Sequence, residues 1–170
     1  MTRLDYEASF RKLAAYLGGE VPPIPAALPR VDDRVLGVSF FKTRVIDDDF
    51  SNLTLPRTFF GRSEIRDVDF RNTDLRESNL CWNDFISVDF SDAVLTNSDL
   101  RSSIFEHVSF ARADLRGADL RRTDFVECTF TDARLDGARL MREQAEGMTL
   151  SDEQLALIDW SEPGEEPAGG

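Results

Sequence analysis

The hydrophobic pattern of the chain repeats every five residues. From Phe40 to Leu140, each fifth residue is apolar without a break. This period matches neither the 3.6-residue repeat of a helix nor the two-residue repeat of a strand. A short period sustained over the 21 pentads of residues 38–142 is typical of a solenoid.

A period of twenty residues overlies the pentads, so that like residues recur at i and i+20. It predicts a coil of four five-residue sides and about five coils. Phenylalanines at a strand spacing of about 4.8 Å would also stack favourably. We name the sides after their first central residues: Phe40, Val45, Phe50 and Leu55. The predicted structural ladders are the central residues of two sides: Phe50, Phe70, Phe90, Phe110 and Phe130, and Leu55, Leu75, Leu95, Leu115 and Leu135.

A second inward position lies two residues before each central residue. It holds mostly small side chains, such as Thr73, Ser98 and Ala118. Small residues are expected where side chains from four sides meet on one axis. Asp48, Leu53 and Asn83 are the larger residues at this position.

The segment Ala113-Asp114-Leu115-Arg116-Gly117-Ala118-Asp119-Leu120-Arg121-Arg122 resembles the A-(D/N)-L-x-x signature of pentapeptide-repeat proteins. The resemblance covers residues 38–142. It implies an all-β solenoid, specifically a right-handed quadrilateral parallel β-helix, with short capping helices at both ends. The signature is specific for the fold and says little about function.

Residues 1–20 are predicted to form an N-terminal capping helix, with Tyr6, Phe10, Leu13 and Leu17 on one stripe. Residues 21–37 are rich in proline and predict an extended linker. A helix here would cover the exposed strand edges of the first coil. The alternative is a helix that binds a partner.

Residues 143–160 are predicted to form a C-terminal cap. Ser151 and Gln154 have the spacing of a capping box, and Leu155 and Ile158 give the following short helix an apolar side. Because resistance-type members of the resembled family often pair through a C-terminal element, we expect a monomer or a C-terminal-helix dimer. The composition of residues 161–170 predicts a disordered acidic tail.

The sequence contains no signal-peptide pattern and no apolar run long enough to span a membrane, which predicts a cytoplasmic protein without membrane contact. Cys81 is expected to point outward and Cys128 inward, so they should not form a disulfide. His107 is the only histidine. No metal-ligand spacing or catalytic motif is present, and we expect no enzyme activity and no cofactor.

The net charge of −12 is distributed unevenly. Residues 143–170 carry eight acids and no base, the Val45 and Phe50 sides are acidic, and the Phe40 side is basic. Charged stripes on an outer surface are sufficiently explained by the need to keep the protein in solution. Complementary electrostatic fields also guide charged partners to a surface. The candidate partner contacts are the exposed aromatic residue and the charged residues of these sides: Trp82, Asp67, Asp69, Asp84, Asp89, Arg121 and Arg122.

Two main functions are consistent with this pattern. The first is a rigid module or scaffold that binds an unknown protein through a polarised face. The second, implied by resemblance to quinolone-resistance members of the family, is a DNA mimic that binds a type II topoisomerase (DNA gyrase or topoisomerase IV) without itself binding nucleic acid. The basic Phe40 side argues against the second. A purely structural domain of a larger assembly is a third possibility.

Overall fold

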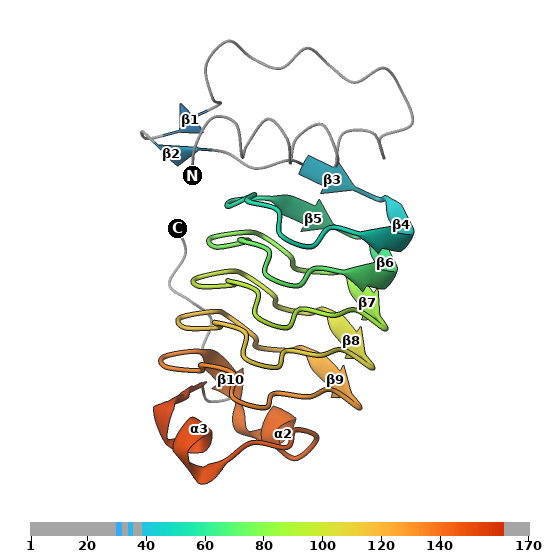
Figure 1. Cartoon of the computed structure of the whole chain (residues 1–170). Helices are drawn as coiled ribbons and strands as arrows, with labels where there is room; N and C mark the ends of the chain where they lie inside the picture. Colours follow the sequence, from blue (N-terminus) through green and yellow to red (C-terminus); the bar gives the residue numbers. More distant parts are fainter. Residues whose placement is uncertain (1–29, 32–33, 36–38, 162–170) are drawn as a thin grey trace, which may run out of the picture.

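The computed structural model describes residues 30–31, 34–35 and 39–161 (Figure 1). The predicted N-terminal helix, most of the proline-rich linker and residues 162–170 of the predicted tail lie outside this part. Within the linker, β1 (Arg30–Val31) and β2 (Arg34–Val35) form an antiparallel pair.

The described chain winds into a parallel β-solenoid of about six turns (Figure 1). On the Val45 side, one sheet contains five strands in the order β4, β6, β7, β8 and β9. On the Phe40 side, β3 pairs with β5 and β10 pairs with β11. The strand bounds are β3 Ser39–Phe41, β4 Arg44–Asp49, β5 Phe59–Gly61, β6 Glu64–Asp69, β7 Asp84–Ile86, β8 Ile104–Glu106, β9 Asp124–Val126, β10 Arg139–Met141 and β11 Asp159–Ser161.

The twenty-residue period is the register of the solenoid. Val45 pairs with Ile65, and Leu140 pairs with Trp160. Isolated bridges such as Thr54 to Asp74 keep this offset on the sides without long strands. The predicted β-helix is therefore confirmed. Because β11 continues the register, the C-terminal cap completes a turn beyond the five coils expected from the repeats.

Both predicted ladders form the core, and each of their side chains is at most 2% exposed. The rings of Phe70 and Phe90 stack with centroids 5.0 Å apart and an interplanar angle of 12°. The first pair of the ladder is not stacked, because the ring planes of Phe50 and Phe70 make an angle of 67°. Phe60 packs edge-on against Phe70 at 6.2 Å, so the ring geometry there depends on two sides of the coil.

The small inward residues also satisfy backbone carbonyls. Ser98 Oγ donates to the carbonyl of Leu75 at 2.9 Å, 23 residues earlier, and Thr123 repeats this geometry towards Leu100. Asn83, one of the larger exceptions, is buried and donates to the carbonyl of Phe60 at 2.8 Å. No buried side-chain polar atom of the described residues lacks a hydrogen-bond partner.

The last turn replaces two sides with short helices, α2 (Arg142–Ala145) and α3 (Asp152–Leu157). The predicted capping box of Ser151 and Gln154 is confirmed. The Gln154 amide nitrogen also donates to the carbonyls of Phe130 and Ala133, at 2.8 and 2.9 Å. Gln144 at the start of α2 makes equivalent bonds ten residues earlier, to Leu120 and Thr123. No helix of the described residues is long and apolar enough to cross a membrane.

Candidate functional site

Trp82 occupies a backbone position that is unusual for its type. The residue two places after each central residue turns the corner of the coil with positive φ, as at Asn97 and Gly117. Polar residues and glycine occupy these corners elsewhere, and Trp82, with φ of 59°, is the only apolar residue at one of them in the described chain. Its side chain is 64% exposed. Neither backbone preference nor burial explains a tryptophan here.

Basic residues precede Trp82 along the same row of corners. Lys42 and Arg62 occupy the equivalent positions of the two earlier coils, and Ser102 and Arg122 follow. Lys42, Arg62 and Trp82 line one open depression of about 410 Å³, to which Arg44, Glu64 and Asp84 also contribute. We call Lys42, Arg62 and Trp82 the Trp82 corner. A large aromatic surface beside two cationic side chains suits an acidic partner segment that also carries apolar groups.

Ion pairs neutralise much of the basic charge elsewhere on the Phe40 side. Arg101 contacts Asp99 at 2.7 Å, and Arg121 contacts Asp119 at 2.5 Å. Burial opposes ionisation of Asp119, but hydrogen bonds from Arg121 keep the pKa of Asp119 below its ordinary value. Arg121 is only 5% exposed, so it offers a partner little surface, whereas Arg122 next to it is exposed.

The candidate acids of the Phe50 side are also paired with arginine. Arg71 contacts Asp69 at 2.5 Å and approaches Asp89 at 3.8 Å. The hydrogen bond from Arg71 lowers the pKa of Asp69. Asp67 is exposed and lines the same open depression as Asp69 and Asp89. The structure thus brings three of the four candidate acids together, while Asp84 lies beside the Trp82 corner.

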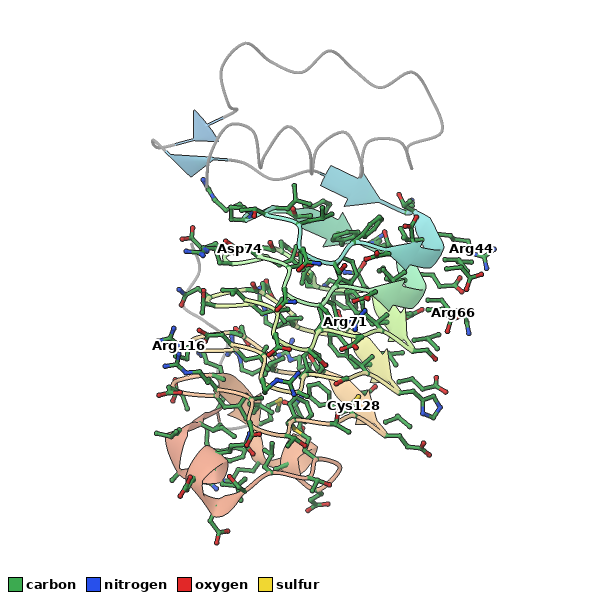
Figure 2. The ribbon with its side chains drawn as sticks, viewed as in Figure 1. Arg44, Arg66, Arg71, Asp74, Arg116 and Cys128 are labelled. Atoms are coloured by element: carbon green, nitrogen blue, oxygen red, sulfur yellow. The ribbon has the colours of Figure 1, made fainter. Side chains whose placement is uncertain are left out.

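A tripeptide pattern in the sequence predicts these aspartate–arginine ion pairs, although the net charge of each side does not reveal them. Aspartate one residue before a central Phe or Leu and arginine one residue after it form an ion pair across the central residue. The five such tripeptides begin at Asp69, Asp74, Asp99, Asp114 and Asp119. Figure 2 shows Asp74 and Arg116, from two of these pairs, on one side of the rod. Both members of each pair lie on one side of the rod, so pairing leaves the net charge of that side unchanged but reduces the unpaired charge that it offers to a partner.

The Val45 side changes in charge along its length. Arg44 and Arg66, which extend from the same side of the rod in Figure 2, both contact Glu64, at 3.0 and 3.3 Å. Nearer the C-terminus, Asp84 and Asp124 have no ion pair with the described residues. His107 lies between Glu106 and Glu127, at 3.6 and 3.0 Å. No group of acids, cysteines and histidine in the described ranges has the geometry of a metal site.

Both cysteines are free thiols, in agreement with the sequence. Burial raises the pKa of Cys81 and of Cys128, which disfavours the reactive thiolate form of both residues.

The family model for pentapeptide repeats matches residues 49–80, 63–101 and 103–142, which together cover more than half of the chain. The chain belongs to the pentapeptide-repeat family. No curated protein sequence matches it. This family consists generally of structural or binding proteins.

The solved structure of one family member, HetL, shows the same fold. HetL, involved in heterocyst differentiation regulation in the cyanobacterium Nostoc sp. strain PCC 7120, matches with TM-score 0.61 and 18% identity, over 63% of this chain and 45% of HetL. This pentapeptide-repeat chain thus spans less than half of HetL's length. QnrB1, a plasmid-mediated fluoroquinolone resistance protein, matches with TM-score 0.42 and 19% identity, over 60% of this chain and 46% of its own. Rfr23 from the cyanobacterium Cyanothece 51142 matches with TM-score 0.40 and 16% identity, over 59% of this chain and 85% of Rfr23.

Proposed function

We propose that this protein is a non-catalytic, cytoplasmic binding module that docks a protein partner at the Trp82 corner. The observation that carries the proposal is the exposed tryptophan at a left-handed corner. A bulky residue is disfavoured in this backbone conformation, and an exposed indole does not contribute to the core. Exposed tryptophans that contact partners are frequent energetic centres of protein interfaces.

The surroundings of Trp82 indicate the chemistry of the partner. Lys42 and Arg62 add positive charge along the row, and Arg62 makes no ion pair with the described residues. The hydrogen bonds between coils hold the corner rigidly, as from Trp82 N–H to the Arg101 carbonyl at 3.1 Å. A rigid surface loses little entropy on binding. An acidic segment with one aromatic or aliphatic anchor fits these features.

The ion pairs favour this proposal over the topoisomerase-binding DNA mimic. A DNA mimic needs a dense row of uncompensated negative charge, because phosphates dominate the affinity of DNA-binding surfaces. On the Phe50 side, Arg71 pairs with Asp69, and Arg112 pairs with Asp92 at 2.7 Å. Asp67 is exposed and Asp89 is partly exposed with only a 3.8 Å approach from Arg71, so both could serve such a role and a gyrase assay separates the two functions.

Photo-crosslinking followed by binding measurements tests the proposal. A benzophenone amino acid placed at position 82 should capture a partner in the native host, whereas the same group at exposed Leu157, in the distant cap, should not. With the captured partner purified, Trp82→Ala should weaken binding about 30-fold, as expected for a loss of about 2 kcal/mol at an interface centre. Leu157→Ala is the matched control and should leave the affinity unchanged.

A gyrase supercoiling assay with and without fluoroquinolone tests the alternative function, the DNA mimic. Under the proposal, the protein neither inhibits nor protects gyrase. Inhibition or protection that disappears in an Asp67→Lys, Asp89→Lys double variant and persists in Trp82→Ala would replace the proposal with the DNA mimic.

A further inference from the structure

The outer face of the five-stranded sheet carries two straight rows of side chains. Strand pairing without any offset aligns the residue before each central residue into one row and the residue after it into another. From β4 to β9, the first row is Arg44, Glu64, Asp84, Ile104 and Asp124, and the second is Ile46, Arg66, Ile86, Glu106 and Val126. All of these side chains are exposed or half-buried. We call these two rows the outer sheet face.

Aliphatic side chains on the outer sheet face lie open to solvent. Ile46, Ile104 and Val126 are 37%, 42% and 48% exposed, and Ile86 is half-buried. The described residues include only two other large hydrophobic side chains that are exposed, Trp82 and Leu157. Because covering aliphatic surface is favourable, this face is a candidate for association with another protein surface.

Charge on the outer sheet face changes sign along the solenoid. Its two basic residues, Arg44 and Arg66, lie on the first two strands and share one acid, Glu64, at 3.0 and 3.3 Å. The last three strands carry only acids on these rows: Asp84, Glu106 and Asp124. A complementary partner therefore presents acids to the first two strands and bases to the later ones.

A second copy of the chain, turned end to end, has this order of charges. We propose that two copies associate through their outer sheet faces with antiparallel solenoid axes. A two-fold axis along the outer surface of β7 reverses the order of the strands and keeps the position along each strand. Then β4 of one copy faces β9 of the other, and β6 faces β8. The strands of the two copies run in nearly the same direction, as in aligned packing of sheets.

This arrangement places opposite charges against each other. Arg44 faces Asp124 of the second copy, Arg66 faces Glu106, and the two-fold axis repeats both contacts. Within the two rows, the like-charged contact is that of Asp84 with its own equivalent, beside the axis. Four favourable contacts therefore stand against one unfavourable contact, and Asp84 limits the affinity.

The aliphatic side chains also meet in this arrangement. Ile46 faces Val126 of the second copy, and Ile86 lies against its own equivalent. Parallel solenoid axes would instead exchange the two rows within each coil. Asp124 would then face Val126, and Asp84 would face Ile86. Carboxylates covered by aliphatic groups are costly, so the charges and the aliphatic groups favour the antiparallel dimer.

The corner residues on either side of the sheet lie at the rim of this interface. Like charges approach there, Lys42 towards Arg122 and Asp47 towards Glu127. All four side chains are exposed in the single chain, and solvent at a rim weakens such repulsion. The two Trp82 side chains lie on one rim, outside the facing rows, so the dimer is independent of the function proposed for the Trp82 corner.

Sedimentation equilibrium of the full chain tests the dimer. The outer sheet face spans roughly 20 Å along the solenoid, which is small for a stable interface. We therefore expect a weak dimer with a dissociation constant of about 100 µM, weakened further by added salt because charges select it.

Exchange of charge between the two ends tests the antiparallel orientation. Arg44→Asp and Asp124→Arg should each weaken the dimer about 30-fold, because two favourable contacts become repulsive. An equimolar mixture of the two variants should associate like the native protein, since positions 44 and 124 are complementary again between unlike copies. Circular dichroism melts check that each variant is folded.

Two matched substitutions separate specific contacts from net charge. Asp84→Asn and Asp124→Asn remove the same charge from the same row. The first should tighten the dimer about threefold, because it relieves repulsion at the axis, and the second should weaken it about threefold. A general effect of net charge would shift both in the same direction.

Three results would overturn the proposal. The first is a monomer at about 1 mM, ten times the expected dissociation constant. The second is a mixture of Arg44→Asp and Asp124→Arg that stays monomeric, or asparagine variants that shift together. The third is a dimer that tolerates both charge reversals and is lost in Leu157→Asp, which would place the contact at the C-terminal cap.

Discussion

The inner turns of the solenoid and its last turn satisfy backbone carbonyls by different means. In the inner turns, a serine or threonine hydroxyl of one coil reaches a carbonyl of the coil before it, as Ser98 reaches Leu75. In the last turn no such hydroxyl is available, and Gln144 and Gln154 extend an amide to two carbonyls each. A repeat can use short side chains because the next repeat is always adjacent, whereas an end requires longer ones.

The strongest test of the inner turns is a charge on the solenoid axis. Leu95 is fully buried, so Leu95→Arg places an unpaired guanidinium among apolar side chains. We expect the loss of the cooperative transition in a circular dichroism melt, or a destabilisation above about 4 kcal/mol. Asp136→Arg, at an exposed position outside the left-handed corners, should melt like the native protein. An unchanged melt for Leu95→Arg would contradict the register.

Removing a cap amide should have the next largest effect. Gln154→Ala leaves the Phe130 and Ala133 carbonyls and the Ser151 N–H without their partner. Because the site is partly buried, we expect a loss of about 2 kcal/mol in urea unfolding. Glu153→Ala, its exposed neighbour, is the matched control. Equal stability of the two variants would mean that the glutamine does not close the end of the solenoid.

Removing one inner hydroxyl should cost less. Ser98→Ala deletes a single hydrogen bond to Leu75, and we expect a loss of about 1 kcal/mol in the same urea experiment. The chain tolerates alanine at this position one coil later, since Ala118 is fully buried there. If Ser98→Ala is as damaging as Gln154→Ala, the inner turns depend on hydroxyls as strongly as the end depends on amides.

The smallest expected effect concerns pH. The pKa of Asp119 is lower in the folded protein than in the unfolded chain, where it is about 4. Its ion pair with Arg121 therefore stabilises the fold above that pH, and this contribution is lost as the pH falls through the folded value. Asp119→Asn should melt below the native protein at pH 7, and the gap should narrow at pH 3. An equal gap at both pH values would exclude this ion pair as the cause.

The buried residues were predictable from sequence because each pentad presents fixed positions to the axis. Phe70 and Leu75 lie where the period of five places them. The C-terminal capping box was also predictable, but not the reach of Gln154 across to Phe130, since that depends on how a helix replaces one side.

The candidate site was less predictable. Trp82 was recognisable as an exposed aromatic, but its left-handed backbone conformation is seen only in the structure. Arg121 is not an accessible contact, because its side chain lies against Asp119. Counting charges along the sequence does not reveal this rotamer. The end of the five-stranded sheet at β9 depends on α2 replacing the next strand, and no local pattern in residues 124–126 encodes that event.

Because each twenty-residue coil adds one strand spacing, the number of coils sets the distance between two sites along the axis of the solenoid. Trp82 and β9 lie two coils apart, a separation of roughly 10 Å along the axis at strand spacing. Inserting one complete coil after Leu100 would lengthen this distance by about 4.8 Å and leave the Trp82 corner and the C-terminal cap unchanged. A partner that contacts both the Trp82 corner and the C-terminal cap would bind the lengthened protein more weakly, whereas a partner that contacts only the Trp82 corner would not.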